Sequence, residues 1–145
     1  MTAGTRQLLL AGGRFGPTLA AAQVLRAIAR GLQAGGLPAP AQFPLDEHEG
    51  AGARELLDAL DFDARMRASH AVVVVAARLS ERTLAASIAF EIATRARQSG
   101  VPAYAITARN ELSAFDARIL DLQAILEAGS ARALSAAGRR LAALL

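Results

Sequence analysis

Short apolar runs alternate along the chain with longer stretches whose apolar residues recur every three or four positions. The runs at 6–13, 70–77 and 101–108 have the length of strands, and their lack of polar alternation predicts burial on both faces. The longer stretches have the spacing of amphipathic helices. Strands that alternate with helices predict a mostly parallel sheet with right-handed crossovers and helices on both faces.

The first helix is expected within 15–36, where Val24, Ile28 and Leu32 form a stripe at spacing four. Pro17 suits the first turn of this helix, and a pair of glycines stops it. The strongest helical pattern spans 79–99, with Ser80 as the expected cap of its first turn. Within it, Glu91 and Arg95 are spaced to form an ion pair. Its apolar face consists of Leu84, Ile88, Ile92 and Ala96.

The remaining segments are expected to add strands to the sheet and helices to its faces. Because of its three prolines, 37–46 can be a strand only at the edge of the sheet, if it is a strand at all, and 50–69 has the pattern of a helix broken near Asp61. The chain then continues with one or two helical turns at 113–121, a short strand or helix at 122–129 and a terminal helix at 130–145. The prediction is one domain over residues 1–145, a Rossmann-like three-layer α/β sandwich with about five strands.

Composition narrows the class of protein without naming a reaction. With 53% apolar residues over 145 positions, the chain can bury a core without disulfides or metals. It has no cysteine, and all sixteen basic residues are arginine. Thiol chemistry, a Walker-type lysine and a Schiff base are therefore excluded. No leader pattern and no apolar run of bilayer length are present, so we expect a cytoplasmic protein with no membrane partner.

The net charge of +3 comes from arginines that are scattered among acidic residues. Nucleic-acid-binding faces gather their basic residues and often add aromatic side chains for stacking. This chain has only one tyrosine and five phenylalanines. The arginines therefore indicate solvated helix faces, and we expect no nucleic-acid partner.

In a sheet of this kind, ligands bind outside the carboxyl ends of the strands, where four loops of this chain are candidates. The first loop, AGGRFGPT at 11–18, contains Gly12, Arg14 and Gly16. Glycines before a helix allow backbone N–H groups to approach an anion. A tight strand-to-helix turn explains the same glycines without a ligand, and this is the preferred interpretation.

The second loop, DEHEG at 46–50, offers Asp46, Glu47 and Glu49 as possible ligands for a divalent metal ion. Four adjacent polar residues cannot all face one ion. Acidic residues are also favoured at the start of a helix by its dipole. A solvated turn is therefore preferred to a metal site.

The third and fourth loops each carry an arginine after a strand. Arg78 is the one strong polar group after the valine run, and Arg109 and Asn110 follow the next strand. Guanidinium and amide donors at such positions can hold a phosphate or a carboxylate. Pairing of Arg109 with Glu111 or Asp116 explains the arginine equally well. The residues alone therefore predict an α/β domain with a possible site for a small anion.

The stretch AGGRFGPTLAAAQVLRAIARGL, residues 11–32, consists of a strand, a turn of the form F-G-P-T and a helix. PLDEHEG, residues 44–50, is a shortened form of P-L-A-D-G-G-E-G, and LDFDARMRASHAVVVVAARLSERT, residues 60–83, follows a pattern that contains G-E-G-R-L-D. In this order the motifs resemble the bacterial type of the glycerate kinase family. Residues 1–52 resemble the amino-terminal part of that family's discontinuous domain, and residues 55–145 resemble its carboxyl-terminal part.

The resemblance implies an ATP-dependent phosphotransferase acting on glycerate, with a second domain inserted into the first. Here the two halves join directly near 50–58, which removes the inserted domain and one wall of the active-site cleft. Where the family has acidic residues, this chain has Gly13, Ala76 and Ser80, while Arg78 is retained. Phosphoryl transfer needs a metal ion held by carboxylates, so these replacements imply a loss of catalysis.

Three functions fit these features. The first is a catalytically degenerate binding or scaffolding domain without a cofactor, which forms a homodimer or associates with another protein over apolar surface that the missing domain leaves exposed. The second is a small phosphotransferase that uses ATP and Mg²⁺, with the acidic residues of 46–50 at the metal and Arg78 and Arg109 at the phosphates. The third is a regulator that binds a small acid such as glycerate through Arg78 without converting it.

Overall fold

The computed structural model of the protein describes residues 7–45, 52–80 and 87–145. Its five strands are all parallel and form one sheet in the order β2-β1-β3-β4-β5. The strands are β1 (Leu8–Gly12), β2 (Ala41–Pro44), β3 (Ala71–Leu79), β4 (Ala103–Asn110) and β5 (Leu122–Glu127). The predicted α/β class and the number of strands are confirmed.

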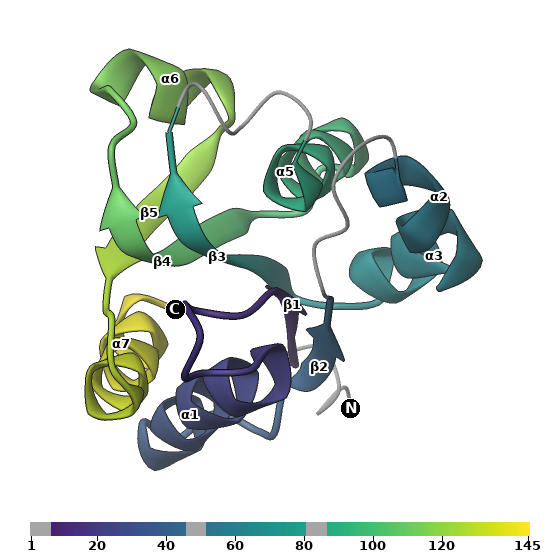
Figure 1. Ribbon diagram of the computed structural model, residues 1–145. Coiled ribbons are helices and arrows are strands. Elements are labelled where there is room, and N and C mark those ends of the chain that lie inside the picture. The colour runs from purple at the N-terminus through teal and green to yellow at the C-terminus, as the bar shows by residue number, and fades with distance from the viewer. Residues whose placement is uncertain (1–6, 46–51, 81–86) are drawn as a thin grey trace.

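Helices cover both faces of the sheet and give the molecule three layers (Figure 1). One face carries α1 (Ala21–Ala34) and α7 (Ala131–Leu144), which lie side by side. The other face carries α2 (Gly52–Ala59), α3 (Phe62–Arg67) and α5 (Ile88–Ser99), and the short α6 (Ala114–Ile119) precedes β5. Among the described residues, no helix has both the length and the apolar character needed to cross a membrane.

The central strand β3 separates two hydrophobic cores. Val73 and Val75 belong to the core under α1 and α7, whereas Val72 and Val74 belong to the core under α2, α3 and α5. All four valines are at most 2% exposed. A strand that is covered on both faces needs apolar residues at every position, which explains the unbroken valine run.

The stripe predicted for the first helix is confirmed, but its predicted start is wrong. Val24, Ile28 and Leu32 are fully buried in α1. The helix begins at Ala21 rather than at Pro17, because the chain first folds back on itself. The N–H group of Phe15 donates to the carbonyl oxygen of Leu19 at 2.9 Å. This contact closes a tight loop ahead of the helix and places the Pro17 position within that loop.

The helix predicted over 79–99 does not begin at Leu79, which is the last residue of β3. The expected role of Ser80 as a helix cap stays a prediction, because the residues that follow it lie outside the described part of the chain. The helix α5 begins at Ile88, and the N–H group of Phe90 donates to the Ser87 side chain at 3.1 Å. Residues 81–86, with the expected core residue Leu84, lie outside the described part of the chain.

Other segments agree with the sequence patterns. The proline-rich stretch forms the edge strand β2, and the helical stretch at 50–69 is divided at Asp61, whose φ of 54° lies in the left-handed region. The undecided stretch 122–129 contains the strand β5. Strands expected to end at 77 and 108 instead continue to Leu79 and Asn110, because β3 and β4 stay paired up to these two residues.

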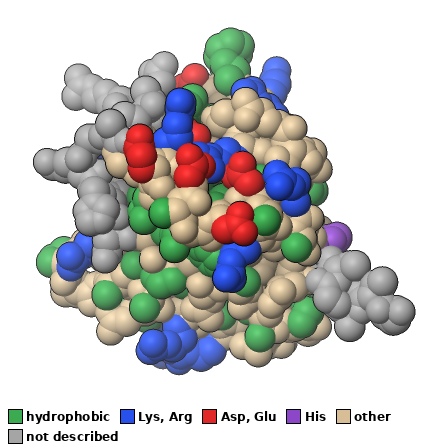
Figure 2. All heavy atoms as spheres, turned by 90° about the vertical axis from the view of Figure 1, so that its right-hand side faces the viewer, with side chains coloured by type: hydrophobic (Ala, Val, Ile, Leu, Met, Phe, Trp, Pro, Cys, Tyr) green, Lys and Arg blue, Asp and Glu red, His purple; other side chains and the backbone are tan. Residues whose placement is uncertain are grey.

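The helices α2 and α3 are tied to α5 by one buried guanidinium. Arg95 of α5 is 9% exposed and contacts Glu91, Asp58 and Asp63 at 2.9 to 3.0 Å. The predicted Glu91–Arg95 ion pair is thereby confirmed. Figure 2 faces the side of the molecule that carries α2 and α3, where acidic and basic side chains gather above a more apolar surface.

Candidate functional site

The strand order of the sheet reverses between β1 and β3, which are neighbours in the sheet but not in the sequence. Ligands of doubly wound sheets bind in the crevice at such a point. Gly12 is the register partner of Val75, and the Gly13 N–H group donates to the Val75 carbonyl oxygen at 3.3 Å. Gly13 and Ala76 therefore lie close together at this crevice. In this chain both positions lack the acidic side chains that the family resemblance leads one to expect there.

The glycine-rich loop after β1 has structural reasons for its residues. A Cβ atom on Gly12 would overlap the carbonyl oxygen of Val75, so only glycine allows the two strands this close approach. Gly16 has a φ of 67°, which favours glycine. The Arg14 guanidinium donates to the carbonyl oxygens of Gly16 and Pro17 at 3.1 and 3.5 Å. These contacts favour the strand-to-helix turn, and the anion-binding role of Gly12, Arg14 and Gly16 stays a prediction.

A cluster of charged side chains lies farther along β3 and β4, near the carboxyl ends of these strands. Arg78 and Arg109 are register partners on these adjacent strands. Glu111 lies between them: Arg78 donates from Nε to Oε1 at 2.9 Å and from Nη2 to Oε2 at 3.2 Å. The Nε atom of Arg109 lies 3.1 Å from the same Oε2. One carboxylate thus bridges two guanidinium groups, and we call these three residues the arginine pair site.

The backbone around the arginine pair site is fixed by further hydrogen bonds. The Glu111 N–H group donates to the Leu79 carbonyl oxygen at 2.7 Å, which extends the pairing of β3 with β4. The Asn110 N–H group donates to Glu127 Oε2 at 2.8 Å. The Asn110 side chain is used in a turn, because its Oδ1 accepts from the Leu112 N–H group at 3.1 Å. The predicted role of Asn110 as a ligand-binding amide therefore stays a prediction, with a structural role beside it.

The charges of the site do not cancel. Two guanidinium groups and one carboxylate leave one positive charge. The pKa of the Glu111 carboxyl group is lowered, mainly by the hydrogen bond from Arg78. Burial opposes this effect, and the positive charges of Arg78 and Arg109 lower the pKa further. The Arg78 and Arg109 side chains are 52% and 69% exposed, and Glu111 is 35% exposed. The site is therefore an open, positively charged surface that water and a small anion can reach.

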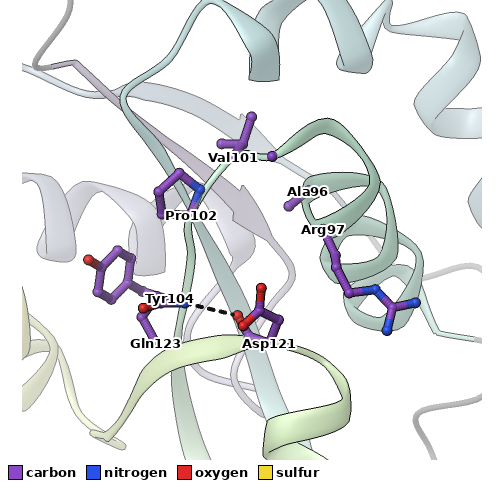
Figure 3. Close-up of a pocket in the computed structure, with 8 residues that line it drawn as sticks. Ala96, Arg97, Val101, Pro102, Tyr104, Asp121 and Gln123 are labelled. Carbon is purple, nitrogen blue, oxygen red and sulfur yellow. Dashed lines mark hydrogen bonds between the residues drawn. The ribbon is translucent and has the colours of Figure 1, made fainter.

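A pocket of about 290 Å³ lies elsewhere, at the amino ends of β4 and β5 (Figure 3). Tyr104, Asp121 and Gln123 line it, together with residues from the end of α5 and the loop that follows. Arg97 at its rim donates to the Ile119 carbonyl oxygen at 2.8 Å and so holds the end of α6. The sequence patterns did not indicate this pocket. It lies at the amino ends of the parallel strands, whereas the arginine pair site lies at their carboxyl ends.

The proposed metal ligands Asp46, Glu47 and Glu49 lie outside the described residues, so the metal site stays a prediction. Within 7–45, 52–80 and 87–145, no group of three or more acidic or histidine side chains is arranged to hold a metal ion.

Sequence reasoning named Arg78 and Arg109 separately, and it named Glu111 as a partner of Arg109 only. It missed that Glu111 also binds Arg78, which is 33 positions away in the sequence. The sequence shows that each arginine comes three positions after an apolar residue, but only the structure shows that these residues, Val75 and Ile106, are register partners. Because Arg78 and Arg109 each lie three residues past a paired position, they lie opposite each other on the two strands.

Comparison of the chain with protein-family models, with curated proteins and with solved structures found no match. The resemblance to the glycerate kinase family therefore stays a hypothesis based on the motifs, and the geometry of the arginine pair site is what a functional proposal can use.

Proposed function

We propose that the protein is a binding domain for a small anion, which the arginine pair site holds without converting it. The observation that carries this proposal is the placement of two guanidinium groups on neighbouring strands with a single shared carboxylate between them. Like charges placed opposite each other destabilise a sheet. Glu111 neutralises one of the two positive charges, and a bound anion at this position would neutralise the other.

The donors that remain suit a carboxylate or a phosphate. A guanidinium group has five N–H donors in a planar fork that matches both kinds of anion. Glu111 engages two nitrogen atoms of Arg78 and one of Arg109. The Arg109 side chain is the more exposed of the two, so most of its donors can be offered to a ligand.

The residue types at the expected reaction centre support binding rather than catalysis. The whole chain contains no cysteine and no lysine, and small residues stand at the family's acidic positions Gly13, Ala76 and Ser80. Arginine binds anions well, but it stays protonated and so cannot act as a general base. A domain of this kind senses or carries a small anion, and inorganic phosphate is the first anion to test.

Replacing Arg78 or Arg109 by glutamine should weaken the binding of phosphate by about tenfold in each case. A charge-assisted hydrogen bond contributes about 1.5 kcal/mol, which corresponds to about that factor. We would follow the titrations by NMR, using the Nε–Hε signals of the arginine side chains. Arg132→Gln, at an exposed position in the first turn of α7, is the matched control and should bind as the wild type does.

Two results of this titration would overturn the proposal. One is unchanged binding in Arg78→Gln and Arg109→Gln combined with a loss in Arg14→Gln, which would place the anion at the loop after β1. The other is the absence of phosphate binding to the wild type.

The phosphotransferase alternative is tested by adding ATP and Mg²⁺ to the same sample. Its metal ligands would be Asp46, Glu47 and Glu49. A loss of ATP binding in Glu47→Ala, together with formation of a phosphorylated acid, would replace the binding function by this alternative.

A homodimer or another protein partner also stays a prediction. Phe115 and Ile119, one turn apart on α6, are 66% and 49% exposed. Sedimentation velocity separates the monomer from the dimer directly.

A further inference from the structure

The Glu111 carboxylate makes the contacts that a bound acid would make. It accepts two hydrogen bonds from one edge of the Arg78 guanidinium, and its Oε2 atom is also 3.1 Å from the Arg109 Nε atom. Two parallel hydrogen bonds from one guanidinium edge are the strongest arrangement that an arginine offers to a carboxylate. The chain's own side chain therefore occupies the best position in the site.

The backbone holds Glu111 in place, and its side chain reaches the surface. Its N–H group is fixed on the Leu79 carbonyl oxygen, and the residue lies between β4 and α6, outside any regular element. Its side chain is 35% exposed. The carboxylate can therefore rotate away from Arg78 into water without any change in the backbone.

We propose that Glu111 is an internal competitor that must leave Arg78 before an anion can bind there, and that the site consequently selects small dianions. This inference rests on the proposed anion-binding function. An intramolecular carboxylate has a high effective concentration, so a free monocarboxylate that offers the same two oxygens cannot displace it at moderate concentration. A phosphate monoester, sulfate or a dicarboxylate carries a second charge, which gains the attraction of both guanidinium groups and compensates for the displacement.

The test compares two variants that change the net charge equally. Glu111→Gln removes the competitor, whereas Glu127→Gln removes a carboxylate from the adjacent strand that binds the Asn110 N–H group. With sulfate as the probe, we expect Glu111→Gln to bind at least tenfold more tightly than the wild type, and Glu127→Gln to stay within threefold of it. With acetate as the probe, only Glu111→Gln should bind. The Nε–Hε signals of Arg78 and Arg109 report the site directly.

A second measurement uses the wild type alone and does not depend on the folding of a variant. Sulfate keeps both charges in mild acid, while Glu111 loses its charge there. Its carboxylate is faced by Arg78 from β3 and by Arg109 from β4, and the neighbouring acid on β5 is Glu127. Because Arg78 lowers the pKa of Glu111, the Glu111 side chain becomes protonated and releases Arg78 only below the ordinary carboxyl range of about pH 4.3. Sulfate affinity of the wild type should rise there and approach that of Glu111→Gln.

The outcomes separate this inference from the proposed function. If neither the wild type nor Glu111→Gln binds sulfate, the anion-binding function itself is wrong. If the wild type binds sulfate as tightly as Glu111→Gln, or more tightly, anion binding stands and the competition is wrong. An equal gain in Glu127→Gln would also overturn the competition, because net charge alone would then explain it.

Discussion

Replacing Gly31 by alanine should lower the free energy of unfolding by about 2 kcal/mol. Gly31 lies where α1 crosses α7, and a Cβ atom at this position would overlap the Ser135 carbonyl oxygen. It would also come within 2.9 Å of the Arg139 backbone nitrogen. Backbone atoms of a helix cannot move aside singly, so the two helices must separate. Overpacking of this kind costs about 3 kcal/mol at the upper end, and the better helix propensity of alanine recovers about 1 kcal/mol.

Gly138 provides the reciprocal contact, since its Cβ atom would overlap the Ile28 carbonyl oxygen. Gly138→Ala should therefore show a similar loss. Gly129→Ala is the matched control, because its Cβ atom would meet nothing closer than the Ala108 Cβ atom at 4.0 Å. Its change should stay within about 0.5 kcal/mol. Urea unfolding measures all three, and a Gly31→Ala protein as stable as Gly129→Ala would contradict the close helix contact.

The predictable part of this fold is the part in which burial alone decides the pattern. Val72 to Val75 could be assigned to a central strand because covering both faces requires apolar residues at consecutive positions. The apolar stripe of α1 could be predicted in the same way, because Val24, Ile28 and Leu32 all face one core. The edge strand β2 followed from its prolines, which remove the N–H groups that a central strand would need.

The ends of the elements were less predictable because pairing between distant segments decides them. Nothing near Arg78 and Leu79 in the sequence shows that β3 continues past Ala77. It continues because Arg109 and Asn110 of β4 lie opposite and supply ladder partners. For the same reason, serine preference alone did not identify Ser87 as the cap of α5, where its side chain accepts from the Phe90 N–H group.

The candidate site illustrates the same limit at the level of side chains. Its arginines were visible as polar groups after strands, but their common partner Glu111 became apparent only with the register of β3 and β4. A one-residue change of register would place one arginine on the opposite face of the sheet. The site is therefore a property of the pairing, and its chemistry cannot be read from either strand alone.

Replacing Arg95 by methionine should destabilise the protein by about 2 kcal/mol. The Arg95 side chain is 10% exposed, and besides its acidic partners it donates to the Arg54 carbonyl oxygen at 3.3 Å. Burial by itself lowers the pKa of Arg95, but hydrogen bonds to Glu91, Asp63 and Asp58 raise it overall, so the group stays charged. Breaking a fully buried ion pair costs about 3 to 5 kcal/mol. The cost is smaller here because Asp58 and Asp63 are 68% and 44% exposed and can be hydrated.

The loss should come mainly from Glu91, whose side chain is 18% exposed and which, among the described residues, keeps Arg54 as its ion-pair partner at 3.8 Å. Glu91→Gln should therefore recover part of the stability in the Arg95→Met protein, although it destabilises the wild type. Arg54→Met is the control, because its side chain is 75% exposed and its removal should cost less than about 0.5 kcal/mol. Urea unfolding of the four variants gives the coupling energy. Purely additive losses would mean that the acids are hydrated independently, and that α2 and α3 are held to α5 by apolar contacts instead.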